Sequence, residues 1–334
     1  MDAGICSSRI LTVKAILIVN PASGTISKHK VVPKIIKRLQ SYGVDVIVAP
    51  TEGPGHATEI AQKSAREGVE AVLCCGGDGT VNETARGLIG TGVPLGIIPA
   101  GSGNGLARHL GIPVDVERSL KVIAEHNVLD IDYGTANDAP FFCTFGVGFD
   151  AAVSERFARQ KRRGLMMYLK SAIDEYIHFA PERYIIEAEG KTIADHAYLV
   201  VACNASQYGN NAFIAPEASV TDGELDITVV HTGNLFKQAV LGVDFLTGFI
   251  GKNALIDTFR ARHVRIIRQS TGAAHIDGDP LVMPSVIDIE CHPQKLTIFA
   301  PTKQTRFRPI ITPWCLFWRD AWLMVSRLFR GDAL

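Results

Sequence analysis

The chain has 334 residues, a length that suggests two domains at about 150 residues each. Hydrophobic residues make up 47% and charged residues 20%, which argues against a disordered chain or a coiled coil. The 34 basic and 34 acidic residues give a net charge of zero, which argues against bulk attraction to nucleic acid, so no nucleic-acid partner is expected.

The cysteines and the apolar runs indicate where the protein works. Seven cysteines form no CxxC pair, which argues against a zinc ribbon or a disulfide framework and for a reducing compartment. The N-terminal apolar stretch runs into Asn20-Pro21 without a small-residue cleavage site, so it predicts a strand rather than a signal peptide. Two uncharged runs, 87–107 and 197–216, are broken by Gly, Pro, Asn or Ser. We therefore expect a soluble or peripheral protein.

In residues 13–126, short apolar runs alternate with longer amphipathic segments. The runs predict strands at Val13–Val19, Val44–Ala49, Ala71–Cys75 and Leu95–Ile98. The segments between them predict helices at about 29–41, 55–67, 80–90 and 102–110. Because this alternation needs crossover connections, it predicts a three-layer α/β domain with a parallel sheet, assigned to residues 1–126.

After about residue 127, closely spaced strands dominate. They are predicted at Val128–Tyr133, Phe141–Phe145, Tyr184–Glu189, Ala197–Ala202, Glu224–His231, His263–Arg268, His275–Asp277, Val286–Cys291 and Lys295–Phe299. Helical patterns interrupt them only at about 150–179 and 234–249. This spacing predicts a mainly antiparallel β-sandwich domain over residues 127–301, with a cleft between the two domains.

Polar, glycine-rich loops follow three of the predicted N-terminal strands. They are Asn20–Gly24, Gly76–Glu83 and Pro99–Asn104. The carboxyl ends of parallel strands meet at one edge of a sheet, so we expect the loops to converge on one crevice. Glycine lets backbone N–H groups approach phosphate oxygens, and a following helix presents its positive end. A tight strand–helix turn would explain any one loop alone, but the three together favour a phosphate site.

The usual phosphate fingerprints are missing from these loops. The sequence has no GxxxxGK[ST], and no GxGxxG follows the first strand. Asp78 adds a carboxylate suited to a metal ion or to a hydroxyl proton.

The motifs NPASG, GGDGTVNE and PAGSGN, in this order and spacing, resemble the catalytic domain of the diacylglycerol kinase superfamily. The superfamily includes bacterial diacylglycerol kinases, sphingosine kinases and ceramide kinases. The resemblance continues through Gly146–Asp150, Thr221–Asp226 and Asp277-Gly278-Asp279, and covers about residues 13–300. It implies an active site between the domains and transfer of the γ-phosphate of ATP, with Mg²⁺, to the hydroxyl of a membrane lipid such as diacylglycerol or a sphingoid base.

The resemblance also implies roles for individual residues. The ATP site would be lined by Asn20, Pro21, Ala22, Ser23, Gly24, Thr51, Gly76, Gly77, Asp78, Gly79, Thr80, Val81 and Asn82, with the Ser102 hydroxyl near the phosphates. A structural Mg²⁺ would be bound by Asp222 with Ser219 and Glu224. Asp279 stands where the family carries its general base, usually a Glu, so the base remains open among Asp279, Asp277 and Asp78. Ser102 makes the third loop more similar to sphingosine kinases.

Apolar and basic residues of the second domain offer a lipid slot and a membrane contact. Candidates for the slot are Phe141, Phe142, Phe145, Val147, Phe149 and residues 165–169, with ordinary core packing as the alternative. Basic residues cluster at Arg156, Arg159, Lys161, Arg162 and Arg163. They predict either a solvated helix face or contact with an anionic lipid surface.

The C-terminal segment, 302–334, carries all three tryptophans of the chain, at positions 314, 318 and 322. It holds six basic and two acidic residues, and apolar residues recur every three or four positions from Trp314 onward. The pattern predicts an amphipathic helix that lies in the membrane interface. Packing on the second domain or a homodimer seam is the alternative.

Three functions compete at this point. The first is a lipid kinase located in the cytoplasm and associated peripherally with the inner face of the membrane. The second is a soluble NAD kinase-like enzyme, which would not explain the GSGN loop or the aromatic tail. The third is a lipid- or nucleotide-binding regulator without catalysis, favoured only if Asp279 cannot replace the family's Glu.

Overall fold

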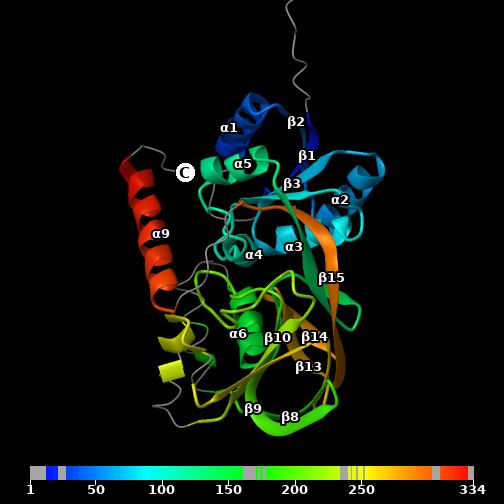
Figure 1. Ribbon diagram of the computed structural model, residues 1–334, viewed down its shortest axis with the longest axis vertical. Coiled ribbons are helices and arrows are strands. Elements are labelled where there is room, and N and C mark those ends of the chain that lie inside the picture. Colours follow the sequence, from blue (N-terminus) through cyan, green and yellow to red (C-terminus); the bar gives the residue numbers. More distant parts are fainter. Residues whose placement is uncertain are drawn as a thin grey trace, which may run out of the picture.

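The computed structural model describes residues 13–21, 28–160, 171, 174–175, 178–233, 240–241, 243–245, 247–250, 253–302 and 309–329. In Figure 1 an α/β part with both α1 and α2 lies above a strand-rich part, and helix α9 stands along one side of both.

The N-terminal part is built from parallel strands and the helices that connect them. In chain order these are β1 (Val13–Val19), α1 (Lys28–Ser41), β2 (Val44–Pro50), α2 (His56–Arg66), β3 (Ala71–Gly76), α3 (Asp78–Leu88), β4 (Leu95–Pro99), α4 (Gly105–His109) and α5 (Val116–Ala124). The sheet order is β4-β3-β1-β2, and every pair is parallel.

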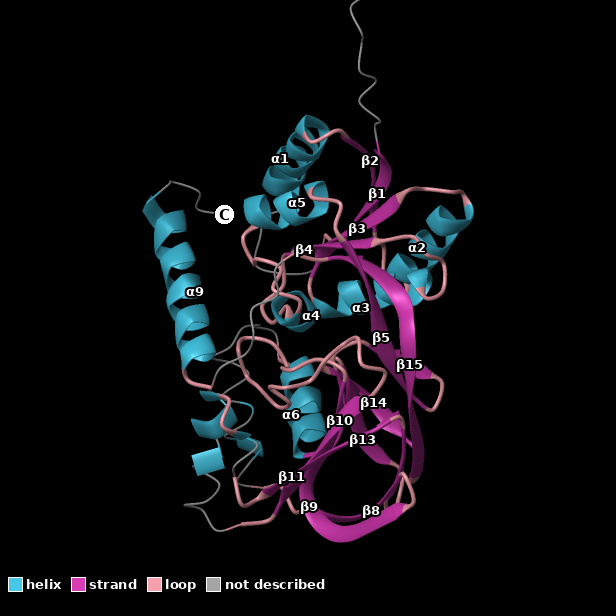
Figure 2. Cartoon of the chain, in the orientation of Figure 1, coloured by secondary structure: helices cyan, strands magenta, loops and turns pink. Residues whose placement is uncertain are grey.

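Helices cover both faces of this sheet, because successive side chains of a strand point to opposite sides. On one face Leu17 packs with Ile35 of α1 and Ile123 of α5. On the other face Ile18 packs with Ala61 of α2 and Ala85 of α3. The predicted three-layer α/β domain with a parallel sheet is confirmed (Figure 2).

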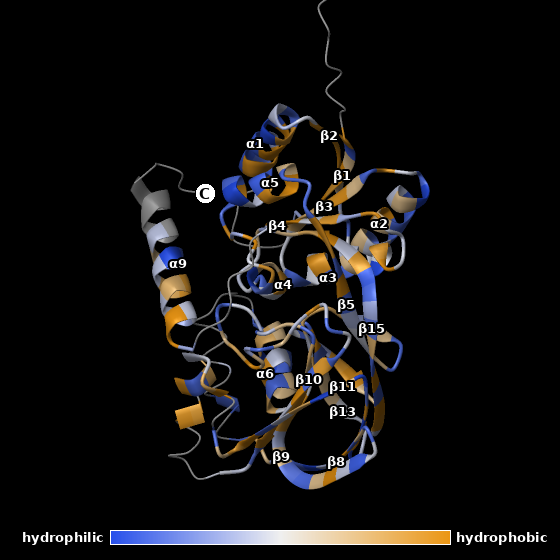
Figure 3. Ribbon diagram, in the orientation of Figure 1, coloured by the Kyte–Doolittle hydropathy of each residue, from blue (hydrophilic) through white to orange (hydrophobic). Residues whose placement is uncertain are grey.

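The second part is mainly antiparallel. Its elements are β5 (Val128–Ala136), β6 (Ala139–Phe141), β7 (Thr144–Gly148), α6 (Phe149–Ala158), β8 (Glu182–Ala188), β9 (Lys191–Cys203), β10 (Leu225–His231), β11 (Ile256–Ala261), β12 (His263–Ile267), β13 (Gly272–Ile276), β14 (Asp279–Met283) and β15 (Val286–Phe299). They curve around a core that includes Phe141, Phe145 and Tyr184 (Figure 3). The predicted β-sandwich-like domain is confirmed.

Two long strands connect the parts. The first half of β15 pairs with β12, and Ile298 near its end pairs in parallel with Leu95 of β4. β5 runs antiparallel beside β15 along both halves, with a register shift between His292 and Leu296. All strands consequently belong to one continuous sheet.

Several elements differ from the predicted ones. α5, β11 and β14 have no predicted counterpart, the strand predicted at Phe141–Phe145 is replaced by the separate strands β6 and β7, and β15 joins two predicted strands. α4 begins at Gly105 rather than 102, because Asn104 has a left-handed φ of 54°. The helix predicted at 150–179 appears as α6, which ends at Ala158, and residues 171 and 174–175 are also helical, whereas residues 161–170 lie outside the described part. Of the helix predicted at 234–249, residues 240–241, 243–245 and 247 are helical, and residues 234–239, 242 and 246 lie outside the described part.

The predicted C-terminal helix is present as α9, Ile311–Phe329. Among the described residues, no helix is long and apolar enough to cross a membrane.

Candidate active site

The second and third glycine loops meet through their backbones. A Cβ placed on Gly101 would lie 2.6 Å from the Cα of Gly77, and the Ala100 N–H donates to the carbonyl of Gly76 at 2.9 Å. Only glycine permits so close an approach. The loops that follow β3 and β4 therefore converge, as the sequence predicts.

Asp78 connects these two loops. It begins α3, and its carboxylate accepts from the N–H of Asn104 at 2.9 Å and of Gly105 at 2.6 Å, where α4 starts. Burial and the neighbouring Asp277 carboxylate raise the pKa of Asp78, and the two N–H groups oppose the rise. Asp78 thus supplies the cap that α4 would otherwise lack.

A side-chain hydrogen bond joins Asn20 of the first loop to the second loop. Asn20 follows β1, and its amide donates to the Thr80 hydroxyl at 3.2 Å. Thr51 follows β2, and its N–H donates to the carbonyl of Val19 at 2.9 Å. Pro21 is exposed, and Ala22, Ser23 and Gly24 lie outside the described residues.

Other motif residues stabilise the same region. A Cβ on Gly76 would lie 2.6 Å from the Cβ of Thr80, and Val81 is buried in the core. Glu83 accepts from the N–H of Ala57 at 3.2 Å, so it caps α2, whose own N-cap residue is Gly55. Ser102 lies between the two close-packed glycines of the third loop.

Asp277 forms the tip of the β13–β14 hairpin with Gly278. Their φ angles are 50° and 87°, as a two-residue hairpin turn requires. The Asp277 carboxylate accepts four hydrogen bonds, from the Asn82 amide and from the N–H groups of Phe142, Cys143 and Thr144, at 2.7–3.0 Å. This carboxylate therefore fixes the hairpin of the second domain to α3 of the first.

Asp279 lies across the GGDGT turn. It is exposed at the start of β14, and a Cβ on Gly79 would be 3.0 Å from its Oδ2. The structure thus brings Asp279, Gly79, Asp277 and Asn82 to one place, although 195 positions separate Asn82 from Asp277 in the chain.

A buried polar network beside this place is not evident from the sequence. Asp150, at the start of α6, is within 2.9 Å of His275 and accepts from the Tyr208 hydroxyl at 3.0 Å. Asp150 and His275 are 5% and 1% exposed, and Gly146 makes room for both, since a Cβ there would lie 2.3 Å from Asp150 Oδ2. The GVGFD motif points to Asp150, but no local signal points to Tyr208.

The segment between β9 and β10 packs on the third loop. The Asn210 N–H donates to the Gly103 carbonyl at 3.2 Å. His109 of α4 accepts from the Ser206 N–H at 3.1 Å through Nδ1, and burial lowers the pKa of His109 to about 4. The second domain thus contacts the glycine loops at several points.

The predicted magnesium ligands lie on the turn before β10. Asp222 accepts from the Glu224 N–H at 3.2 Å, and its Oδ2 is 3.7 Å from Arg260. The Ser219 hydroxyl contacts that of Thr221 at 3.3 Å. Among the described residues, no group of three His, Cys, Asp or Glu is placed to hold a metal ion. The donors of this turn are nevertheless all oxygen atoms, which suit Mg²⁺.

The proposed lipid-slot residues belong largely to the core. Phe141, Phe142, Phe145 and Val147 are at most 1% exposed. Phe149 packs edge-on against Phe179. Residues 165–169 lie outside the described part.

Two of the predicted basic residues have acidic partners. Arg156 pairs with Glu175 at 2.9 Å, and Arg159 pairs with Glu155. Lys161, Arg162 and Arg163 lie outside the described part.

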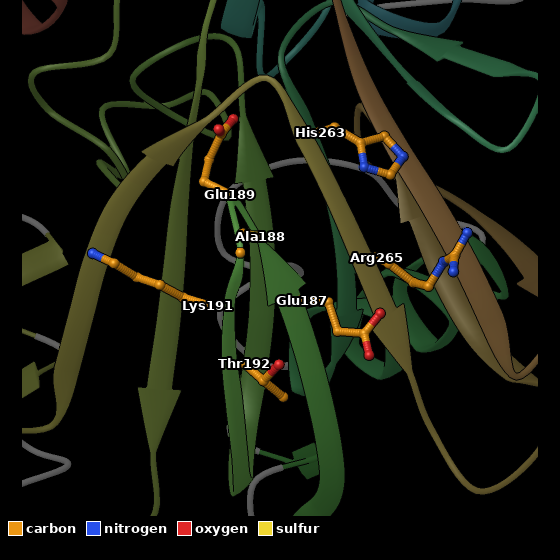
Figure 4. A pocket seen from close by; sticks show the side chains of 8 residues that line it. Glu187, Ala188, Glu189, Lys191, Thr192, His263 and Arg265 are labelled. Atoms are coloured by element: carbon orange, nitrogen blue, oxygen red, sulfur yellow. The ribbon is translucent and has the colours of Figure 1, made fainter.

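A surface pocket of about 340 Å³ lies away from the loops, on the β8–β9 turn and β12 (Figure 4). Glu187, Glu189, Lys191, His263 and Arg265 are among the residues that line it. Arg265 is paired with Asp288 at 2.7 Å, and none of the motif residues reaches this pocket. It is therefore not the candidate site.

Comparison with known families and proteins agrees with the motifs. Residues 14–136 match the diacylglycerol kinase catalytic domain, and residues 143–300 match the YegS C-terminal NAD kinase beta sandwich-like domain. The chain is 30% identical to a diacylglycerol kinase of Mycobacterium tuberculosis, over 86% of this chain and 95% of that protein. It is 25% identical to a diacylglycerol kinase of Bacillus subtilis, over 80% and 89%.

A solved structure shares the fold as well. The crystal structure of a diacylglycerol kinase from Bacillus anthracis superposes with a TM-score of 0.68, at 25% identity, over 86% of this chain and 97% of that one.

Proposed function

This chain belongs to the diacylglycerol kinase family, and from that membership we propose that it transfers the γ-phosphate of ATP to the hydroxyl of a membrane lipid, diacylglycerol or a sphingoid base. The observation that carries the proposal is the position of Asp279 against Gly79, where a carboxylate of one domain reaches the glycine turn of the other. Phosphoryl transfer needs mainly positioning, charge neutralisation and an oriented hydroxyl.

The phosphates would bind at the start of α3. This helix has 11 residues and begins directly after Gly76 and Gly77, so the positive end of the helix lies at the second glycine loop. Asn20 and Thr51 would line the nucleotide site from the first loop and from the end of β2, and Ser102 would add a hydroxyl near the phosphates. Mg²⁺ bound with ATP would supply neutralising charge.

We assign different roles to the three aspartates. Asp279 would accept the proton of the lipid hydroxyl as the general base. Asp277, which already accepts four hydrogen bonds, would be a positioning residue for the hairpin that carries Asp279. Asp78, occupied by two backbone N–H groups, would hold the second and third loops together.

An assay with labelled ATP tests the proposal. The purified protein is offered diacylglycerol, a sphingoid base, ceramide and NAD in parallel, and we expect phosphorylation of a lipid and not of NAD. Asp279→Asn should lower the rate by about 10²–10⁴, with little change in ATP affinity. Asp279→Glu, which restores the residue usual in the family, should stay within about tenfold of the wild type.

Two results would contradict this function. Phosphorylation of NAD alone would favour the NAD kinase-like enzyme. No transfer to any acceptor, by a protein that binds nucleotide and lipid, would favour a non-catalytic regulator.

We also propose a structural Mg²⁺ at the turn of Ser219, Asp222 and Glu224, with main-chain carbonyls and water completing the oxygen ligands. Because Mg²⁺ bound only to the folded state stabilises it, adding Mg²⁺ should raise the melting temperature of the wild type and not of Asp222→Asn. An equal rise in both proteins would rule out this site.

For location, we propose the cytoplasm, at the inner face of the membrane where such lipids reside. The described cysteines are free thiols, as a reducing compartment requires.

A further inference from the structure

One face of α9, together with Ile310 just before it, exposes large apolar side chains. Each is more than half exposed: Ile310 (53%), Ile311 (55%), Trp314 (61%), Phe317 (59%), Trp318 (55%) and Trp322 (68%). Trp318 contacts Trp314 and Phe317 edge-on, at ring-centroid distances of 5.7 and 5.6 Å. A continuous exposed apolar surface of this kind marks an interaction site rather than ordinary surface variation.

Polar contacts hold α9 to the rest of the molecule. The Arg108 guanidinium, whose side chain is 8% exposed, lies 2.6 Å from the carboxylate of Asp320. The same guanidinium donates to the Gly103 carbonyl of the third glycine loop at 3.0 Å and to Asn211 at 3.2 Å. Just before the first residue of the helix, the Ile310 N–H donates to the Thr247 carbonyl at 2.8 Å. The helix is thus attached to the third glycine loop while its aromatic side chains are exposed.

The charge of the segment indicates what binds there. Residues 302–334 contain six basic and two acidic residues, and Asp320, one of the two acids, is already paired with Arg108 and Arg319. Anionic lipid head groups complement the remaining positive charge. Tryptophan is favoured at the depth where head groups meet acyl chains. Both family matches end by residue 300, so α9 is an addition to the catalytic fold.

We propose that the aromatic face of α9 docks on an anionic lipid bilayer, and that the Asp320–Arg108 contact fixes the docked helix relative to the glycine loop of the active site. The inference rests on the proposed function only in its second part, because a lipid kinase must reach its substrate at the bilayer. The docking itself is tested without ATP, so the two can fail separately.

Intrinsic fluorescence tests the docking in the unmodified protein. All three tryptophans of the chain lie on α9, so their emission reports this helix alone. Vesicles of phosphatidylcholine with phosphatidylglycerol should shift the emission to shorter wavelength, and brominated acyl chains should quench it. Phosphatidylcholine alone should act more weakly, and added salt should reduce the effect. Emission unchanged by anionic vesicles would overturn the proposal.

Substitution gives a second, independent test. The triple variant Trp314→Gln, Trp318→Gln, Trp322→Gln should bind anionic vesicles at least about tenfold more weakly in flotation. Ile47→Gln, which removes a 69% exposed apolar side chain of β2, is the matched control and should bind as the wild type. If the triple variant instead loses a dimer in light scattering and still floats with vesicles, the face joins two copies of the chain and the proposal is wrong.

The orientation part is tested by Asp320→Asn. This variant should keep vesicle binding within about twofold, yet lose about tenfold or more of its activity on lipid in vesicles and less on lipid in detergent micelles. Arg319→Gln leaves the Asp320–Arg108 pair intact and should keep its activity both on lipid in vesicles and on lipid in micelles. Equal losses on vesicles and micelles would show that Asp320 serves the loop alone, and no loss on either would refute the coupling. Vesicle binding without phosphorylation of any lipid would refute the proposed function and leave docking in place.

Discussion

The three aspartates of the proposed active site differ in how much of each carboxylate is available to a substrate hydroxyl. A carboxylate whose oxygens already accept hydrogen bonds from the protein has fewer lone pairs left for a substrate hydroxyl. Asp277 accepts four hydrogen bonds and Asp78 accepts two from backbone N–H groups, and Asp279 is the one of the three that is exposed, beside Gly79. The sequence alone left the base open among the three, because partners so distant in the chain have no local signal.

We predict that Asp277→Asn destabilises the protein as well as slowing it. If the NH₂ group of the new asparagine takes the place of Oδ2, it faces two hydrogen-bond donors, the Asn82 amide and the Phe142 N–H. Leaving buried donors unpaired costs about 1–3 kcal/mol, which thermal or urea unfolding can measure.

Two control variants separate a structural role of Asp277 from a role as the general base. Asp138→Asn, an exposed aspartate in the β5–β6 turn, should change neither the free energy of unfolding nor the rate. Asp279→Asn should change the rate alone. If Asp277→Asn is as stable as the wild type but inactive, Asp277 rather than Asp279 is the base.

At the scale of elements, the sequence predicted what depends on local periodicity and missed what depends on distant pairing. β14 was missed because Pro280 argues against a central strand, but β14 is the last strand of the sheet order, where proline is tolerated. The sequence predicts β15 as two strands, because Pro293 interrupts the strand pattern; the register with β5 shifts at the same place, and the pairing of β15 with both β12 and β4 depends on the whole sheet.

Unlike β14 and β15, helix α5 has a local sequence signal. Asp115 caps the helix by accepting from the Arg118 N–H at 3.0 Å, and the buried positions Leu120 and Ile123 have helical spacing. The second and third glycine loops directly follow β3 and β4, as the sequence predicts, and Asn20 of the first loop directly follows β1. The contact between the second and third loops through Gly77 and Gly101 is evident only from the structure.

That backbone contact makes a prediction at the level of the loops. In Gly101→Ala the new Cβ would lie 2.6 Å from the Cα of Gly77, and a backbone atom cannot give way cheaply. We expect a loss of about 1–3 kcal/mol in stability and at least about a tenfold fall in activity. Gly53→Ala, where the Cβ meets nothing within 4 Å, should leave both unchanged. A Gly101→Ala enzyme of normal activity would show that the two loops need not touch.

For the whole molecule, function depends on how the two domains are held together. Besides the continuous sheet, contacts between described residues cross between the domains near the loops, among them Asn82–Asp277, Arg108–Asn211, Gly103–Asn210 and His109–Ser206. The His109–Ser206 contact should break in acid, because Nδ1 of His109 accepts the Ser206 N–H only while the ring is neutral.

We therefore predict a loss of stability on acidification that depends on His109. Burial lowers the pKa of His109 from 6.5 to about 4, so the folded state disfavours the protonated ring. The unfolded chain binds this proton first, and the stabilisation is complete above about pH 6.5 and lost as the pH falls toward about 4. Between about pH 7 and about pH 5 the loss should reach up to about 2 kcal/mol.

His109→Asn keeps an oxygen able to accept from Ser206 but does not titrate, so its unfolding free energy should fall less over this range. His29→Asn, at an exposed position of α1, should retain the wild-type pH dependence. Should His109→Asn lose stability as steeply as the wild type, acid acts on other groups, and this contact between the domains does not respond to pH.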